Sequence, residues 1–87
     1  MTSTQQSQLD QTPVVLLVDD SEFVHRLLNA RLKTESISIV SAVNGEEGLK
    51  IAKEQLPALI LLELEMPVMD GFETLRQLME DPATRNI

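Results

Sequence analysis

Three short apolar runs, separated by longer segments of mixed character, organise this chain. They cover residues 14–18 (VVLLV), 37–43 (ISIVSAV) and 58–62 (ALILL). The first and third are continuous, and the second is β-branched and partly alternating. Runs of this length and composition are typical of strands buried on both faces of a parallel sheet. We therefore predict three β-strands at these positions.

The segment after the first run carries apolar residues at helical spacing. A predicted apolar face is formed by Phe23, Val24, Leu27, Leu28 and Leu32. Asp20 or Ser21 is placed to cap the backbone N–H groups at the start of this helix. His25 falls off the apolar face and has no phosphotransfer pattern around it, so we interpret it as a surface residue.

Two further helices are predicted. The second covers residues 46–55, after an Asn44-Gly45 turn, and is weakened by Gly48. The third covers residues 72–80 and stops at Asp81-Pro82. The resulting order, βαβαβα, predicts right-handed crossovers and a parallel sheet with helices on both faces, and therefore an α/β fold.

Length and composition exclude several classes of function. The 87 residues allow one small domain, predicted over residues 14–87, after a polar lead-in over residues 1–13 that is expected to be disordered. A net charge of −7 disfavours contact with nucleic acid or an anionic membrane. The chain has no cysteine, no secretory signal pattern and no apolar run of membrane-spanning length. A cytoplasmic location is therefore expected.

Acidic residues directly follow two of the predicted strands. Asp19 and Asp20 come after the first strand and Glu63 comes after the third. In open α/β sheets, ligands bind beyond the carboxyl ends of the strands. If these two strands are neighbours, the three carboxylates converge, and oxygen ligands with retained waters suit Mg²⁺. A weak Mg²⁺ site is expected here, although the two aspartates could also be a helix-start cluster alone.

Two motifs together resemble the receiver domain of two-component response regulators. They are residues 14–20 (VVLLVDD) and 57–71 (PALILLELEMPVMDG). The resemblance extends to residue 87 and implies a partial doubly wound, flavodoxin-like sheet with strand order 2-1-3. The chain stops before the family's last two strand–helix units, and we interpret it as a truncated receiver.

The same resemblance assigns roles to individual residues. It implies that Asp20 binds Mg²⁺ directly, that Asp19 helps through water and that Glu63 completes the acidic site. The backbone carbonyl of Glu65 is a further expected contact. The loop beside the acceptor position is expected to be shaped by Met66, Pro67, Asp70 and Gly71.

Glu63 occupies the position at which receivers carry the aspartate that accepts phosphate. Its carboxylate is one methylene longer, which moves the nucleophile into space that the phosphoryl group would occupy, and this reaction depends mainly on positioning. We therefore expect phosphorylation to be abolished or very weak. Two alternatives stay open: Glu63 mimics the phosphorylated acceptor, or it is a plain solvated acid.

The resemblance implies a phosphorelay signalling module without catalytic residues of its own, which contacts a sensor kinase or an output domain. The family's switching hydroxyl after a fourth strand and lysine after a fifth have no counterpart in this chain. An alternative is the amino-terminal regulatory segment of a longer enzyme such as a diguanylate cyclase. A Mg²⁺-dependent phosphohydrolase is disfavoured because no second nucleophile, general acid or phosphate-binding glycine loop accompanies the acids.

The third predicted strand is expected to lie at the edge of the sheet. The run from Ala58 to Leu62 has no charge, no proline and apolar residues at every position. Exposed edges of this type pair with other strands. If the chain is complete, we expect a homodimer or strand-exchanged oligomer formed through this run.

Overall fold

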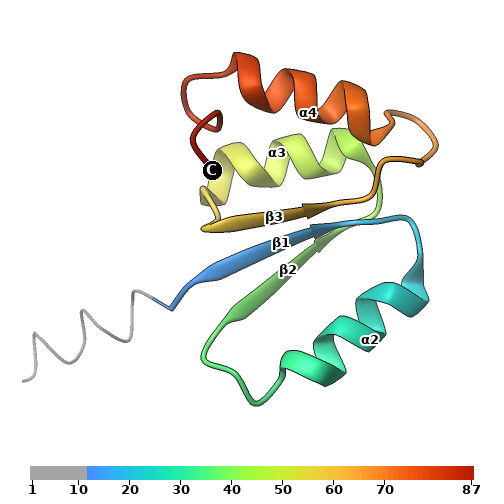
Figure 1. Cartoon of the computed structure of the whole chain (residues 1–87), viewed down its shortest axis with the longest axis vertical. Helices are drawn as coiled ribbons and strands as arrows, with labels where there is room; N and C mark the ends of the chain where they lie inside the picture. Colours follow the sequence, from blue (N-terminus) through green and yellow to red (C-terminus); the bar gives the residue numbers. More distant parts are fainter. Residues whose placement is uncertain (1–11) are drawn as a thin grey trace, which may run out of the picture.

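The computed structural model describes residues 12–87, so the lead-in predicted over residues 1–13 lies almost wholly outside the described part. The elements, in order, are β1 (Val14–Val18), α2 (Glu22–Leu32), β2 (Ser38–Ala42), α3 (Gly45–Gln55), β3 (Leu59–Leu62) and α4 (Gly71–Glu80) (Figure 1). The predicted βαβαβα order is confirmed. The predicted strand bounds differ from these by at most one residue at either end.

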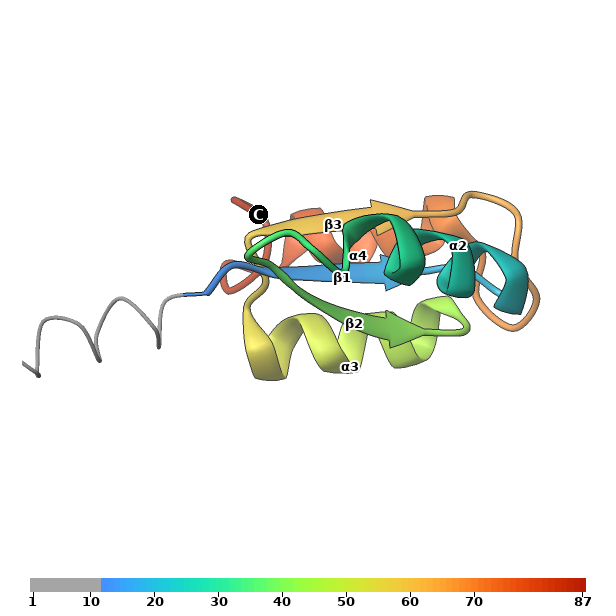
Figure 2. The ribbon, with the colours of Figure 1, turned by 90° about the horizontal axis from the view of Figure 1, so that it is seen from below.

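The three strands form a parallel sheet in the order β2-β1-β3, as predicted. Val18 of the central strand is the register partner of Ala42 on one side and of Leu62 on the other. The two views in Figures 1 and 2 place α2 on one face of the sheet and α3 and α4 on the other. Because the strands are parallel, the carboxyl ends of all three lie at the same end of the sheet.

The main core lies between the sheet and the α3–α4 layer. Its buried members are Leu16, Val18, Ala42, Leu49, Ala52 and Leu78. Gly48, which weakens the helix prediction, is what lets α3 approach β1, because a Cβ there would lie 2.8 Å from a γ-methyl of Val18. No helix between residues 12 and 87 has the length and apolar character needed to cross a bilayer.

The apolar face predicted for α2 is partly wrong. Phe23 and Leu27 are 71% and 49% exposed, and the buried residue of this helix is His25, at 9%. An α-helix turns about 100° per residue, so Phe23 and Leu27 both lie roughly opposite His25, whereas Leu32 and Leu28 lie within about 60° of it. The inward face of α2 is therefore centred on His25, and its assignment to the surface is corrected.

Candidate functional site

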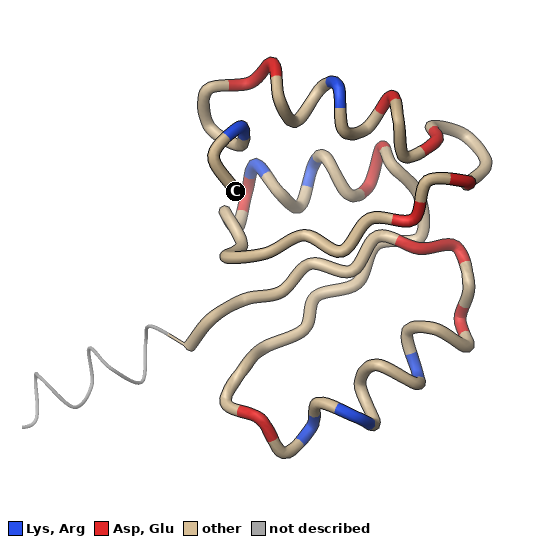
Figure 3. The backbone as a smooth tube through the Cα atoms, viewed as in Figure 1, with Lys and Arg blue, Asp and Glu red and all other residues tan. Residues whose placement is uncertain are grey.

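The carboxyl ends of β1 and β3 place Asp19 and Glu63 on neighbouring strands. Each follows one residue of the Val18–Leu62 register pair. The Glu63 amide donates to the Val18 carbonyl oxygen at 2.9 Å, and the Asp19 amide donates to the Ala42 carbonyl oxygen at 3.0 Å. Figure 3 shows acidic residues gathered along this edge. The predicted adjacency of these two strands is thus confirmed, and we call this region the acidic edge.

Asp19 and Asp20 differ in their surroundings. Asp19 is 8% exposed, and its Oδ1 accepts a hydrogen bond from the Ser21 amide at 2.8 Å. Ser21 is the N-cap of α2, with its Oγ accepting from the Val24 amide at 3.3 Å. Asp20 is exposed to solvent. Asp19 therefore helps to form the turn into α2, while Asp20 presents its carboxylate to solvent.

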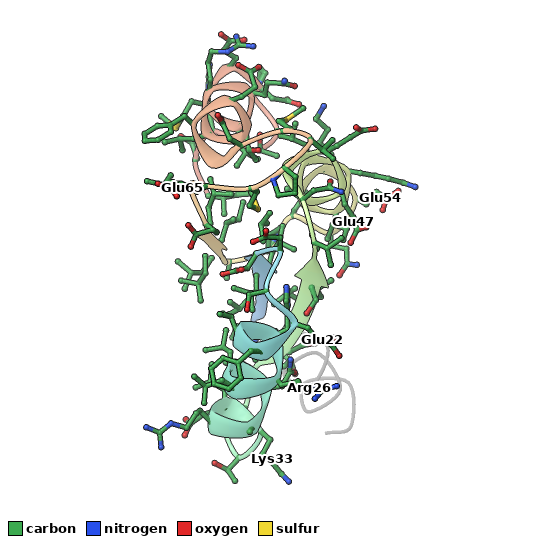
Figure 4. The ribbon with its side chains drawn as sticks, turned by 90° about the vertical axis from the view of Figure 1, so that its right-hand side faces the viewer. Glu22, Arg26, Lys33, Glu47, Glu54 and Glu65 are labelled. Atoms are coloured by element: carbon green, nitrogen blue, oxygen red, sulfur yellow. The ribbon has the colours of Figure 1, made fainter. Side chains whose placement is uncertain are left out.

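Glu63 and Glu65 lie on the loop that leaves β3, and both are exposed. The Glu63 Oε1 accepts from the Glu65 amide at 3.2 Å, which turns this carboxylate toward its own loop. Figure 4 views the molecule from this end and shows the labelled Glu65 side chain directed outward. Direct bonding of a side chain to its neighbouring backbone satisfies the carboxylate locally.

These local bonds bear on metal binding. Within residues 12–87, no group of three or more His, Cys, Asp or Glu side chains is arranged to hold a metal ion. Asp19, Asp20 and Glu63 share one edge, but their carboxylates are not gathered into one cluster. The donor set nevertheless fits Mg²⁺, which prefers oxygen ligands, commonly uses one or two carboxylates and keeps several waters.

The loop after Glu63 is pressed against the end of β3 at Gly71. The Gly71 amide donates to the Leu64 carbonyl oxygen at 2.9 Å. A Cβ at this position would lie 2.3 Å from the Glu63 carbonyl oxygen and 2.5 Å from the Leu64 Cα. Asp70 caps α4 by accepting from the Glu73 amide at 2.9 Å. The Asp70-Gly71 pair therefore fixes the start of α4 beside the acidic edge.

Two methionines hold the middle of this loop. Met66 and Met69 are partly buried and pack against the core. Pro67 is exposed, and its carbonyl oxygen accepts from the Met69 amide at 2.9 Å. Val68 between them has a φ of 70°, in the left-handed region that β-branched residues rarely adopt. The loop is thus a tight turn anchored from within by the methionines.

His25, which the sequence analysis assigned to the surface, is a buried residue near the site. Its Nε2 lies 2.6 Å from the Asp19 carbonyl oxygen, and its Nδ1 lies 2.9 Å from the Ser41 Oγ. The available signal was spacing, because His25 precedes Leu28 and Leu32 by one and two helical turns and so shares their face. A polar residue on that face escapes a search for apolar periodicity.

An exposed network of ion pairs on α4 shifts the pKa of one of its carboxyl groups. Arg76 bonds to the carboxylates of Glu73 and Glu80. Hydrogen bonds from Arg76, and then from Gln77, lower the pKa of the Glu73 carboxyl from its ordinary 4.5 to about 2. These residues share one helix, so the network supports α4 locally.

Comparison with known proteins gives consistent matches. The response regulator PleD of Caulobacter vibrioides is 45% identical over 73 residues, covering 84% of this chain and 16% of PleD. A response regulator receiver domain from Methanoculleus marisnigri superposes with a TM-score of 0.81 at 38% identity, covering 85% of this chain and 60% of that chain. The response regulator TrrA of Thermotoga maritima, solved in complex with Mg²⁺–BeF, superposes with a TM-score of 0.73 at 34% identity. This match covers 78% of this chain and 59% of TrrA.

The chain thus spans less than two thirds of each of these proteins. The family model described as the response regulator receiver domain matches residues 15–87, which include the whole described fold from the second residue of β1 onward. The family predicted from the two sequence motifs is confirmed: the chain belongs to the response regulator receiver domain family.

Proposed function

We propose that this chain is a signalling module of a two-component system that acts through protein contacts and is not efficiently phosphorylated in this form. The observation that carries the proposal is the position of Glu63. It follows the register partner of Val18, beside the acidic pair. The resemblance of the sequence motifs to receivers assigns this position to the aspartate that accepts phosphate. The longer carboxylate of Glu63 is bonded to the Glu65 amide at 3.2 Å instead of standing ready for in-line attack.

The residues that would hold Mg²⁺ are the side chains of Asp19, Asp20 and Glu63 with the backbone carbonyl of Glu65. When bound, the ion would neutralise charge on phosphoryl oxygens. Asp20 is exposed and suits direct ligation, whereas the buried Asp19 already accepts from Ser21 and suits a contact through water. The Mg²⁺–BeF complex of TrrA supports Mg²⁺ binding by relationship, while the choice of ligands rests on the positions of these residues.

Positioning explains why Glu63 should fail as an acceptor. Phosphoryl transfer relies on placing the nucleophile in line with the leaving group, and small displacements are costly. The main-chain ends of β1 and β3 are held by sheet hydrogen bonds, so an extra methylene at residue 63 cannot be absorbed by moving the strand. The carboxylate therefore reaches past the position that an aspartate would take.

The test compares the natural protein with two variants. Each is incubated with acetyl phosphate and Mg²⁺ and then weighed intact. We expect no adduct on the natural protein, a single phosphoryl adduct on Glu63→Asp, and none on the Glu63→Gln control. A stoichiometric phosphate adduct on the natural Glu63 would overturn the proposal, and an unreactive Glu63→Asp would show that side-chain length is not the obstacle.

We also propose that the protein partners are a sensor kinase or an output domain, and that the module works in the cytoplasm. The support is relationship, since the relatives include full-length response regulators such as PleD. The net charge of −7 continues to favour protein partners over nucleic acid. The alternative of a regulatory segment within a longer enzyme is compatible with the 16% of PleD that this chain spans.

For a protein that consists of these 87 residues, a homodimer or strand-exchanged oligomer through residues 58–62 is proposed as well, on a different observation. β3 is an edge strand of the described sheet, and its Leu59 and Leu61 are 50% and 38% exposed. A lysine on an edge strand opposes pairing. We expect Leu61→Lys to convert a dimer to a monomer in light scattering, while Leu27→Lys on α2 does not. A well-folded natural monomer would refute this.

A further inference from the structure

His25 joins three elements behind the acidic edge. It lies in the first turn of α2, and its ring reaches the Asp19 carbonyl oxygen after β1 at 2.6 Å and the Ser41 Oγ on β2 at 2.9 Å. The histidine is 9% exposed, the bond to Asp19 is buried and the bond to Ser41 is partly buried. A ring held at both nitrogens in a buried place has one orientation.

Donor and acceptor chemistry assigns the protons. A carbonyl oxygen can only accept, so Nε2 must carry a hydrogen and donate it to Asp19. In the neutral ring, Nδ1 is then the acceptor for the Ser41 hydroxyl. The contact thus requires the Nε2–H tautomer, which is a property that can be measured.

The hydrogen bond from His25 gives the Asp19 carbonyl oxygen a partner just beyond the last hydrogen bonds of the β-sheet. The Asp19 amide is paired with the Ala42 carbonyl, while the last β1–β3 bond uses the Val18 carbonyl. The next carbonyl, that of Asp19, turns to the histidine instead. Buried backbone carbonyls need such partners, and this one fixes the peptide plane between Asp19 and Asp20. The direction of that plane sets where both aspartate side chains leave the backbone.

We propose that His25 is a positioning residue for the acidic edge, which holds the Asp19–Asp20 backbone in the orientation that presents its carboxylates to a divalent cation. The part that concerns the cation rests on the proposed function. Groups that orient metal ligands without touching the metal typically change affinity by about 10- to 100-fold when removed. If His25 only filled space, replacing it with an apolar ring of similar size would leave the affinity for the cation unchanged.

The experiment uses four variants. His25→Phe keeps a ring but removes the donor, His25→Gln restores a donor at a similar reach, and Ser41→Ala removes the second anchor. Asn29→Ala is the matched control, because Asn29 bonds to the His25 carbonyl from the next turn of α2 and does not reach the edge. Mg²⁺ is titrated while the amide signals of Asp20 and Ser21 are followed by NMR.

We expect His25→Phe to weaken Mg²⁺ binding by about 10-fold, with His25→Gln within about threefold of the natural protein and Asn29→Ala unchanged. Without metal, the Ser21 amide, which donates to the Asp19 Oδ1 at 2.8 Å, should exchange about five- to tenfold faster in His25→Phe, the factor expected for a protecting hydrogen bond weakened by about 1–1.4 kcal/mol. The imidazole nitrogen shifts of the natural protein should report the Nε2–H tautomer.

Each outcome decides one proposal. Equal Mg²⁺ affinity and equal amide exchange in His25→Phe and the natural protein would overturn the positioning role, as would an Nδ1–H tautomer. A natural protein that binds no Mg²⁺ refutes the metal site of the proposed function, and the exchange and tautomer measurements then decide the role of His25. If His25→Phe does not fold, the role of His25 is decided by two other measurements: Mg²⁺ binding and amide exchange in His25→Gln, and the imidazole tautomer of the natural protein.

Discussion

Replacing Gly71 with alanine tests how tightly the loop is held against the acidic edge. The added methyl would lie 2.3 Å from the Glu63 carbonyl oxygen, 2.5 Å from the Leu64 Cα and 2.9 Å from the Glu63 carbonyl carbon. All three are backbone atoms at the end of β3, which cannot rotate away as a side chain can. Ordinary contacts begin near 3.4 Å, so the loop would have to retreat by about 1 Å.

The cost of that retreat can be estimated from its parts. Overpacking of this kind destabilises by about 1–3 kcal/mol. The bond from the Gly71 amide to the Leu64 carbonyl, now 2.9 Å, would open beyond hydrogen-bonding range and cost about 0.5–1.5 kcal/mol. Alanine in place of glycine at a helix position returns at most about 1 kcal/mol. The net expectation is a loss of about 2 kcal/mol in the free energy of unfolding.

Urea denaturation followed by far-ultraviolet circular dichroism measures this loss. With an m-value of about 1–2 kcal/mol/M, the unfolding midpoint of Gly71→Ala should fall by about 1–2 M. Glu54→Ala, an exposed position on α3 labelled in Figure 4, is the control and should stay within about 0.5 kcal/mol of the natural protein. A Gly71→Ala midpoint equal to or above that of the natural protein would refute the argument from close approach.

Two further predictions concern the helix ends. Ser21→Ala removes the N-cap of α2 and should cost about 1 kcal/mol in urea unfolding, whereas the exposed Ser36→Ala should cost nothing measurable. The ion pair with Arg76 lowers the pKa of Glu73 to about 2 from 4.5, so its stabilisation is complete above pH 4.5 and disappears as the pH falls toward 2. The difference in unfolding midpoint between the natural protein and Glu73→Gln should therefore shrink over that window; a constant difference contradicts it.

The sheet could be predicted from the sequence because its strands are simple in composition. A strand buried on both faces must be apolar at every position, and Val14–Val18 meets that demand without interruption. The helical segments between the strands then restricted the topology to right-handed parallel crossovers. The order of the strands came from the family resemblance and not from periodicity. Once the strands were predicted, Asp19, Asp20 and Glu63 could be placed at the carboxyl ends of the first and third strands.

Side-chain directions could not be predicted in the same way. Hydrophobicity assigned Phe23 and Leu27 to the inner face of α2. That face is instead centred on His25, whose ring donates to the Asp19 carbonyl and accepts from the Ser41 hydroxyl. The hydrogen bond that the Glu63 carboxylate accepts from the Glu65 amide is likewise a local contact that the hydrophobic pattern does not predict. The packing role of Gly48 also depends on the distance between two elements, which one segment of sequence does not contain.

Two hydrogen bonds hold the backbone of the acidic edge, and neither of them involves an exposed carboxylate. His25 bonds to the Asp19 carbonyl after β1, and Gly71 bonds to the Leu64 carbonyl after β3. The carboxylate of Glu63, by contrast, is exposed, and its recorded bond is to an amide of its own loop. Changes in the length or charge of that side chain should therefore alter chemistry without altering the fold.

Glu63→Asp provides the measurement of this separation. Because Glu63 is exposed, we expect its free energy of unfolding to stay within about 0.5 kcal/mol of that of the natural protein. Its behaviour with acetyl phosphate should nevertheless change completely, as proposed above. A large loss of stability in Glu63→Asp would show that the glutamate is part of the framework. The gain of a phosphoryl adduct at unchanged stability would show that one methylene at this edge controls reactivity and leaves the scaffold intact.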